Sequence, residues 1–165
     1  IAAFGFRIVA SDPFVPEATM ISHGVEKVEQ DELFRRADLV AVLCPYTSET
    51  HHVIDERALR RMKRTASLVN CARGKLVDTA ALATALDEGW IAGAGLDDLE
   101  EEPSKRPGWT PGDSPLLASP NCIVTPHSAY YSERSMELNR RMTAENARAV
   151  LLGERPINVV RPPAR

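Results

Sequence analysis

Three side chains, those of Arg73, Glu102 and His127, have the chemistry to bind a carboxylate and to move a proton. An arginine guanidinium can hold a substrate carboxylate through two parallel hydrogen bonds, a geometry that lysine cannot offer. A neutral imidazole can take the proton of a hydroxyl group while a hydride leaves the carbon, and the imidazolium can return it. A carboxylate beside the imidazole can hold it in place. The three together fit a site that holds a carboxylate and moves a proton while a hydride leaves or enters.

Each of these residues also has an ordinary interpretation. Arg73-Gly74 can be a common surface turn, and His127 can be a histidine of a loop. The acidic run of residues 100–102 can be a solvated surface segment. Residue type alone therefore leaves both interpretations open.

Asp12 ends the first predicted strand and precedes Pro13. In a Rossmann unit, an acidic residue at the end of the second strand accepts hydrogen bonds from the adenosine ribose hydroxyls. Such a carboxylate repels a 2′-phosphate and favours NAD over NADP. The alternative is an aspartate that only forms a turn before proline.

The histidines outside this set predict no metal site. His23 and the pair His51-His52 have no cysteine or carboxylate near them at the sequence spacing of metal ligands. We therefore expect no bound metal.

Short apolar segments and capped amphipathic segments alternate along the chain. Six strands are predicted, at about residues 6–11, 24–28, 39–43, 66–70, 91–96 and 121–124. Helices are predicted at residues 30–37, 56–62, 79–88 and 132–152, with an irregular loop at 100–119. Asp55 and Asp78 are predicted N-caps, and Gly89 is a predicted helix stop.

This alternation predicts the α/β class, a doubly wound parallel sheet of Rossmann type. The continuous apolar run at residues 39–43 is typical of a parallel strand buried on both faces. The chain contains no Gly-x-Gly-x-x-Gly, and Gly93-Ala94-Gly95 lies inside a predicted strand, where close packing explains it better. We therefore expect an incomplete Rossmann-like sheet that lacks the first strand and its glycine-rich turn.

Composition limits the possible functions. The chain has 165 residues, is 44% hydrophobic and carries a net charge of −3, so nothing in it favours nucleic-acid binding. No apolar run is long enough to cross a membrane. The three cysteines, Cys44, Cys71 and Cys122, form no close pair, which indicates a reduced, cytoplasmic protein.

Taken in order, the motifs of this chain resemble the D-isomer-specific 2-hydroxyacid dehydrogenases. The early motifs are Ala3-Phe4-Gly5-Phe6 leading to Asp12-Pro13, and Cys44-Pro45 with Thr50 five residues on. The central motifs are Leu68-Val69-Asn70-Cys71-Ala72-Arg73-Gly74, Leu76-Val77-Asp78 and Ala81-Leu82. The last are Ile91-Ala92-Gly93-Ala94-Gly95-Leu96-Asp97, Glu102-Pro103 and Thr125-Pro126-His127.

The resemblance implies an NAD-dependent oxidoreductase with a role for each matching residue. Arg73, Glu102 and His127 match the catalytic arginine, glutamate and histidine of the family. The cofactor residues it implies are Asp12 at the adenosine ribose, Cys44, Pro45 and Thr50 along the adenosine side, Cys71 and Ala72 near the nicotinamide ribose, Asp97 at the carboxamide, and Arg73 and His127 beside the nicotinamide. The implied substrate is a 2-hydroxy or 2-keto acid.

The segment from His127 to Glu133 resembles the branch that contains the C-terminal-binding-protein corepressors. That branch often has tryptophan at the position of Tyr130, and Asp98-Leu99 replaces the usual Val-Phe of the family. The alternative function is therefore an NAD(H)-sensing, corepressor-like binding module.

Family members have a substrate domain before the dinucleotide domain. We therefore expect residues 1–131 to be a partial dinucleotide-binding domain and residues 132–165 a C-terminal helix and tail that packs on a substrate domain. The complete protein is expected to be a homodimer. The chain alone is expected to bind NAD weakly and to be inactive.

Overall fold

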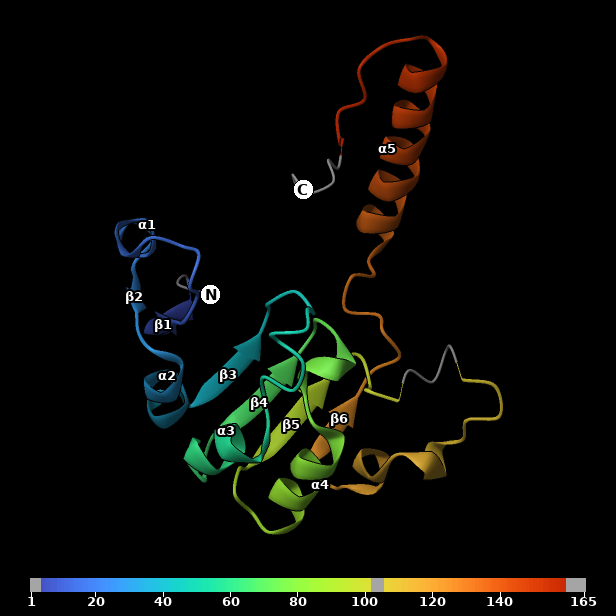
Figure 1. The fold of residues 1–165 in the computed structure, drawn as a ribbon. Coiled ribbons are helices and arrows are strands. Elements are labelled where there is room, and N and C mark those ends of the chain that lie inside the picture. The colour runs from blue at the N-terminus through green and yellow to red at the C-terminus, as the bar shows by residue number, and fades with distance from the viewer. Residues whose placement is uncertain (1–3, 102–105, 160–165) are drawn as a thin grey trace. The chain divides into compact units, whose positions relative to one another are not determined.

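A computed structural model describes residues 4–101 and 106–159 of the chain (Figure 1). The chain divides into two compact units, Ile1–His127 and Ser128–Arg165. The first unit contains the strands, and the second contains one long helix. The roles predicted for residues 1–131 and 132–165 stay predictions.

Four parallel strands form the main sheet of the first unit. They are β3 (Leu39–Val42), β4 (Ser67–Asn70), β5 (Gly93–Leu96) and β6 (Cys122–Val124), hydrogen-bonded in that order. The last residues of β4, β5 and β6 pair in register, Asn70 with Leu96 and Leu96 with Val124. Figure 1 shows the arrowheads of all four strands at one edge. This confirms the predicted parallel α/β sheet and places the segments that follow the strands along a common edge.

The first two strands form a separate sheet, a difference from the single sheet that was predicted. β1 (Ile8–Ala10) pairs in parallel with β2 (Val25–Lys27), and neither pairs with β3. They are joined by α1 (Glu17–Ser22), a helix the sequence pattern did not predict. Its N-cap is Pro16, which makes no side-chain capping hydrogen bond, so the usual start signal is missing.

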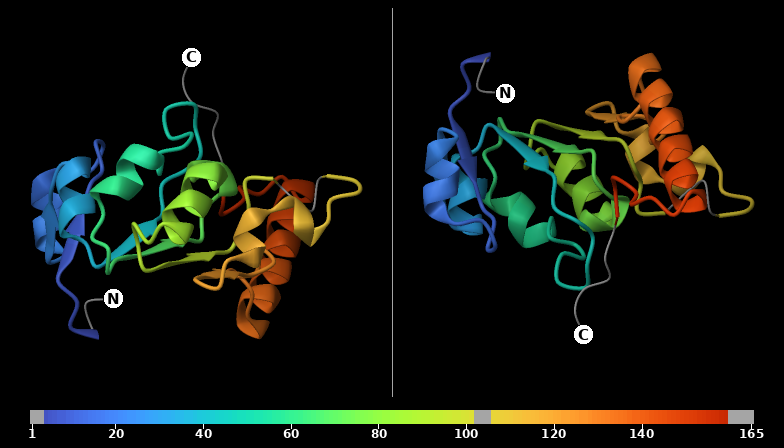
Figure 2. Two further views of the ribbon diagram at one scale, coloured as in Figure 1. Left: turned by 90° about the horizontal axis from the view of Figure 1, so that it is seen from below. Right: turned by 90° about the horizontal axis from the view of Figure 1, so that it is seen from above.

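The remaining helices of the first unit form a layer. α3 (Glu56–Arg61) and α4 (Thr79–Asp87) lie on one face of the four-stranded sheet, and α2 (Gln30–Arg36) packs beside α3 (Figure 2). The Asp55 side chain accepts a hydrogen bond from Ala58 N at 2.8 Å, and Asp78 accepts one from Ala81 N at 3.0 Å. Both predicted N-caps are therefore confirmed. Gly89 follows the end of α4 with φ of 65°, the left-handed conformation that favours glycine.

The core lies between this layer and the sheet. Leu59, Leu68 and Leu82 are fully buried there. On β3, Val40 and Val42 are buried, whereas Leu39 is 51% exposed on the opposite face. The prediction that this strand is buried on both faces was wrong, because among the described residues the helix layer covers only one side of it.

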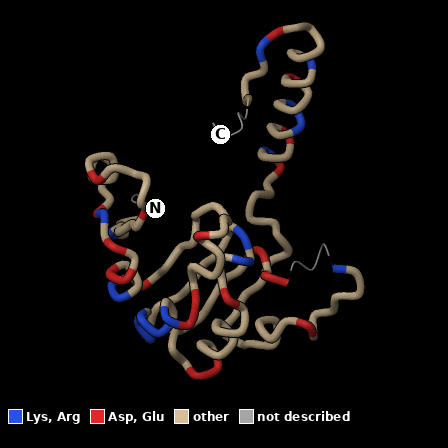
Figure 3. Tube along the Cα trace, in the orientation of Figure 1, with Lys and Arg blue, Asp and Glu red and all other residues tan. Residues whose placement is uncertain are grey.

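The charged residues of the first unit are interspersed in sign (Figure 3). On α3, Arg57 and Arg61 each lie 3.2 Å from a carboxylate oxygen of Asp31 on α2. The two guanidiniums share the single carboxylate of Asp31, and these pairs join two helices of the layer.

The second unit consists mainly of α5 (Glu133–Leu151). Ser132 caps this helix by accepting a hydrogen bond from Ser135 N at 3.0 Å. In the first unit, the loop predicted to be irregular contains two short 3₁₀ turns, η4 (Pro111–Asp113) and η5 (Pro115–Ala118). Among the described helices, none combines the length and the apolar character needed to cross a bilayer.

Candidate active site

The turn after β4 is shaped by Asn70, the last residue of that strand. Its side chain is fully buried, and its Oδ1 accepts a hydrogen bond from Ala72 N at 3.0 Å while its Nδ2 donates to Arg73 O at 2.8 Å. Asn70 thereby closes the turn and leaves Cys71 and Arg73 exposed at the carboxyl edge of the sheet. No role was predicted for Asn70, although a polar residue at the end of an apolar strand indicates such a turn.

Arg73 lies at this edge with its guanidinium in solvent. Its Nη1 donates a 2.8 Å hydrogen bond to the carbonyl of Ala72, next to it in the chain. A guanidinium has five N–H donors, so the capacity to bind a carboxylate remains. Arg73 therefore lies where the sequence predicted, after a strand and exposed to solvent. Its role in binding a ligand stays a prediction.

Gly74 brings the turn after β4 into backbone contact with the loop after β5. It is buried, and a Cβ atom built on it would lie 2.1 Å from Leu99 C and 2.3 Å from Leu99 O. Its N–H donates to Asp98 Oδ2 at 3.3 Å. Only a residue without a side chain allows this approach.

His127 follows β6 at the same edge. Thr125 continues the sheet pairing by donating its N–H to Leu96 O at 2.9 Å, and its hydroxyl donates to Asp97 Oδ1 at 2.5 Å. His127 N then donates to Thr125 O at 2.9 Å, and the residue has φ of 53°. This tight turn directs the half-exposed imidazole back toward the loop after β5.

Asp98 links the two segments that carry the predicted chemistry. Its Oδ1 lies 3.8 Å from Nδ1 of His127, and its Oδ2 accepts the N–H of Gly74. The sequence pattern did not indicate this role, since Asp98 stands in the sequence only as a departure from the usual valine of the family. Glu102 lies outside the described residues, so its pairing with His127 stays a prediction.

The residues predicted on the adenosine side lie in loops after β1 and β3. Asp12 Oδ1 accepts the N–H groups of Phe14 and Val15 at 2.8 and 3.1 Å, which is the turn-forming role of the alternative interpretation. A carboxylate has about four acceptor sites, so a ribose role is compatible with this turn. Thr50 donates its hydroxyl to Pro45 O at 2.7 Å and so fixes the loop after β3.

The three thiols of the chain differ in accessibility. Burial raises the pKa of the Cys44 thiol, and the negative charge of Asp12 adds to that rise. Burial also raises the pKa of Cys122. Cys71 is exposed.

From these differences we expect Cys71 to be alkylated at least about tenfold faster than the other two thiols, because alkylation requires an accessible thiolate. Iodoacetamide labelling of the native chain at pH 8, followed by peptide mass spectrometry, measures the three rates. Cys71→Ser should remove the fast phase, and labelling in urea should equalise the remaining sites. Equal native rates at Cys44 or Cys122 would contradict this expectation.

The loop after β5 is held to the start of α4 by Glu100. Its Oε2 accepts the N–H of Thr79 at 3.0 Å, and its Oε1 lies 2.5 Å from Nε2 of His52. Burial alone raises the pKa of Glu100, but the hydrogen bonds from His52 and Thr79 outweigh it and leave the pKa below its usual value. The carboxylate is therefore ionised near neutral pH.

Comparisons with known proteins show which proteins this chain resembles. Residues 1–129 match the family model described as D-isomer specific 2-hydroxyacid dehydrogenase, NAD binding domain. A glyoxylate reductase of Korarchaeum cryptofilum is 46% identical over 95% of this chain and 46% of its own length. A D-3-phosphoglycerate dehydrogenase of Methanocaldococcus jannaschii is 42% identical over 98% of this chain and 30% of its own length. The solved structure of a D-lactate dehydrogenase with NAD+ from Lactobacillus jensenii has a TM-score of 0.86 and 33% identity, covering 98% of this chain and 50% of that one.

Two facts follow from these matches. The chain spans about half or less of the length of the relatives it matches, 46% of the first and 30% of the second. The relatives named above are dehydrogenases and a reductase, so the resemblance to the corepressor branch is not shown and the sensing module is not favoured.

Proposed function

The chain belongs to the D-isomer-specific 2-hydroxyacid dehydrogenase family, within its NAD-binding domain, and from this we propose that the protein containing it interconverts a 2-hydroxy and a 2-keto acid. One observation carries the proposal. Arg73 after β4 and His127 after β6 lie at one edge of the sheet, in segments that both contact Asp98 after β5. A carboxylate anchor and a proton carrier at the same sheet edge are what such a reaction needs.

Each of the two residues has a distinct role in the proposal. Arg73 binds the substrate carboxylate through its guanidinium fork and polarises the neighbouring carbonyl. His127 takes the hydroxyl proton during oxidation and returns it to the carbonyl oxygen during reduction. Glu102 is proposed to hold the His127 imidazole, as the family resemblance implies. NAD, when bound, accepts or donates the hydride.

The donor set, which lies after β1 and along the carboxyl edge of the four-stranded sheet, fits this cofactor. Asp12 supplies a carboxylate for the adenosine ribose, and the loop with Cys44, Pro45 and Thr50 borders the adenosine side. Four residues are proposed to lie beside the nicotinamide and its ribose: Cys71, Ala72 and Arg73 in the turn that Asn70 closes, and His127. Asp97 is proposed to contact the carboxamide.

We expect Arg73→Lys to lower kcat/KM for a 2-keto acid by about 10–100-fold, mainly through KM, because an ammonium cannot make the bidentate contact. Steady-state NADH oxidation by the full-length gene product measures this effect. Arg64→Lys is the matched control, since Arg64 donates to Gly89 O at the opposite end of α4. An unchanged KM in Arg73→Lys would remove Arg73 as the carboxylate anchor.

We propose that Asp98 is a positioning residue for His127, and its two contacts can be separated by mutation. Asp98→Asn retains an acceptor for Gly74 N but loses the charge that faces His127. We expect a fall in kcat of about 3- to 10-fold with KM and thermal stability unchanged, a modest effect because solvent screens the half-exposed imidazole. Asp98→Ala should in addition lower the thermal midpoint. A wild-type kcat in Asp98→Asn would leave Asp98 a purely structural role.

The same proposal covers the substrate, the cellular location and the oligomeric state of the protein. The substrate is a small 2-hydroxy or 2-keto acid, of the kind named for the relatives, which include a glyoxylate reductase and a D-lactate dehydrogenase. The three free cysteines support a reducing, cytoplasmic location. The complete protein is proposed to act as a homodimer, which sedimentation of the full-length product tests.

A further inference from the structure

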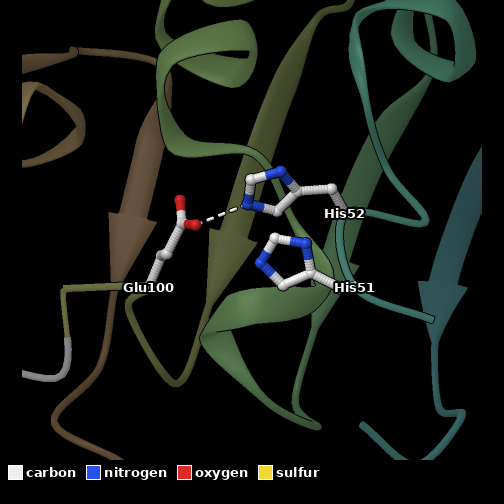
Figure 4. Close-up of side chains that lie close together, drawn as sticks. All are labelled: His51, His52 and Glu100. Atoms are coloured by element: carbon white, nitrogen blue, oxygen red, sulfur yellow. Dashed lines mark hydrogen bonds and ion pairs between the residues drawn. The ribbon is translucent and has the colours of Figure 1, made fainter. Parts of the chain in front are cut away.

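A cluster of metal-binding side chains lies where sequence spacing predicted none. His51 and His52 precede α3, and Glu100 follows β5, 48 positions beyond His52. One potential ligand atom from each residue lies within 4.8 Å of the others. Figure 4 shows the two rings one above the other, each with a nitrogen on the side that faces the Glu100 carboxylate.

From this geometry we propose that His51, His52 and Glu100 bind one divalent transition-metal ion of the Zn²⁺ type. Two imidazole nitrogens and one carboxylate oxygen are a donor set that Zn²⁺ accepts, with the remaining position left to water. Two ligands about 2.1 Å from a tetrahedral ion lie about 3.4 Å apart. An ion therefore requires Nε2 of His52 and Oε1 of Glu100, now 2.5 Å apart, to separate by about 1 Å. The third ligand, His51, must turn toward the ion. The exposed His51 ring can supply this movement.

Two ligands of the cluster are already fixed by the surrounding chain. The backbone N–H of His52 donates a hydrogen bond to Lys75 O at 3.0 Å, and Oε2 of Glu100 accepts one from the backbone N–H of Thr79 at 3.0 Å. The two side chains therefore meet without the ion, and an ion would replace their shared hydrogen bond. His51 stacks on His52 with ring centroids 3.9 Å apart, which keeps the third ligand close.

The second nitrogen of His52 lies near a carboxylate, at a distance longer than a hydrogen bond. Asp78 Oδ2 lies 3.8 Å from His52 Nδ1, on the side of the ring away from Glu100. A carboxylate beside the second nitrogen orients a ligating imidazole and strengthens it as a ligand. The bound ion would join the segment before α3 to the loop after β5, so binding should raise the thermal midpoint of the chain.

The untagged chain, stripped with EDTA, is titrated with ZnCl₂ by calorimetry, and Co²⁺ is added separately to record visible absorption. We expect one Zn²⁺ per chain with a Kd of about 10 µM or tighter, a rise of the thermal midpoint by a few degrees, and a Co²⁺ spectrum typical of nitrogen and oxygen ligands.

His51→Asn tests the site most cleanly, because it leaves the hydrogen bond between His52 and Glu100 in place. His51→Asn and Glu100→Gln should each weaken Zn²⁺ binding at least tenfold, whereas the control His23→Asn, at the end of α1, should bind like the wild type. Absence of stoichiometric binding in the wild type, or wild-type affinity in the folded His51→Asn and Glu100→Gln variants, would overturn the proposal.

Discussion

Replacing His127 with asparagine in the full-length gene product is expected to lower kcat by about 10²–10⁴-fold, the usual contribution of a general acid–base residue. Asparagine tolerates the left-handed backbone that His127 adopts, with φ of 53°, so the change removes the imidazole with little strain. Alanine at the same position should lose as much activity and some stability. Stopped-flow measurement of NADH oxidation with a 2-keto acid gives the rate.

The loss should affect turnover rather than cofactor binding. Dissociation constants for NADH are expected to change little, because the proton carrier acts on the substrate oxygen. His23→Asn, an exposed histidine distant in sequence from the site, serves as the control and should turn over like the wild type. Turnover close to wild type in His127→Asn would remove His127 from the mechanism.

Gly74→Ala is expected to be the most damaging single substitution at this edge. The added Cβ would lie 2.1, 2.3 and 2.4 Å from backbone atoms of Leu99 and Glu100, and backbone cannot rotate away as a side chain can. Overpacking of this kind costs on the order of 3 kcal/mol or more. For a chain of this size, that lowers the thermal midpoint by roughly 6–12 °C.

Gly95→Ala is the matched control for Gly74→Ala. Its Cβ would meet only Val69 Cγ2 at 3.9 Å, an ordinary van der Waals contact, within the same sheet. Circular dichroism melts of the three proteins should give the order wild type, Gly95→Ala close to it, and Gly74→Ala far below. Equal midpoints for the two variants would show that the loop after β5 moves aside without cost.

The local features of the fold could be predicted because their causes are local. Asp55 and Asp78 cap helices through hydrogen bonds that span three residues, and the apolar run at residues 39–43 makes a parallel strand. The α1 helix was missed because Pro16 offers no side-chain cap. The prediction that β3 is buried on both faces was wrong, because burial depends on which elements cover the sheet and not on the residues of the strand alone.

The site could be predicted in part for the same reason. Arg73 and His127 follow strands, and parallel strands bring such residues to one edge. The roles of Asp98 and Gly74 depend on the approach of two loops 24 residues apart. The contact of His52 with Glu100 joins residues 48 positions apart, so spacing along the chain gave no sign of it.

The central claim is that this chain supplies the carboxylate anchor and the proton carrier of an NAD(H)-dependent 2-keto acid reaction. It is tested most directly by NADH oxidation with pyruvate, glyoxylate and methyl pyruvate, using the full-length gene product. We predict turnover with at least one of the two acids. If pyruvate is a substrate, kcat/KM for methyl pyruvate should be at least about a hundredfold lower than for pyruvate, because the ester lacks the charge that Arg73 binds. No oxidation of NADH with either acid, or equal kcat/KM for pyruvate and its ester, would contradict the account.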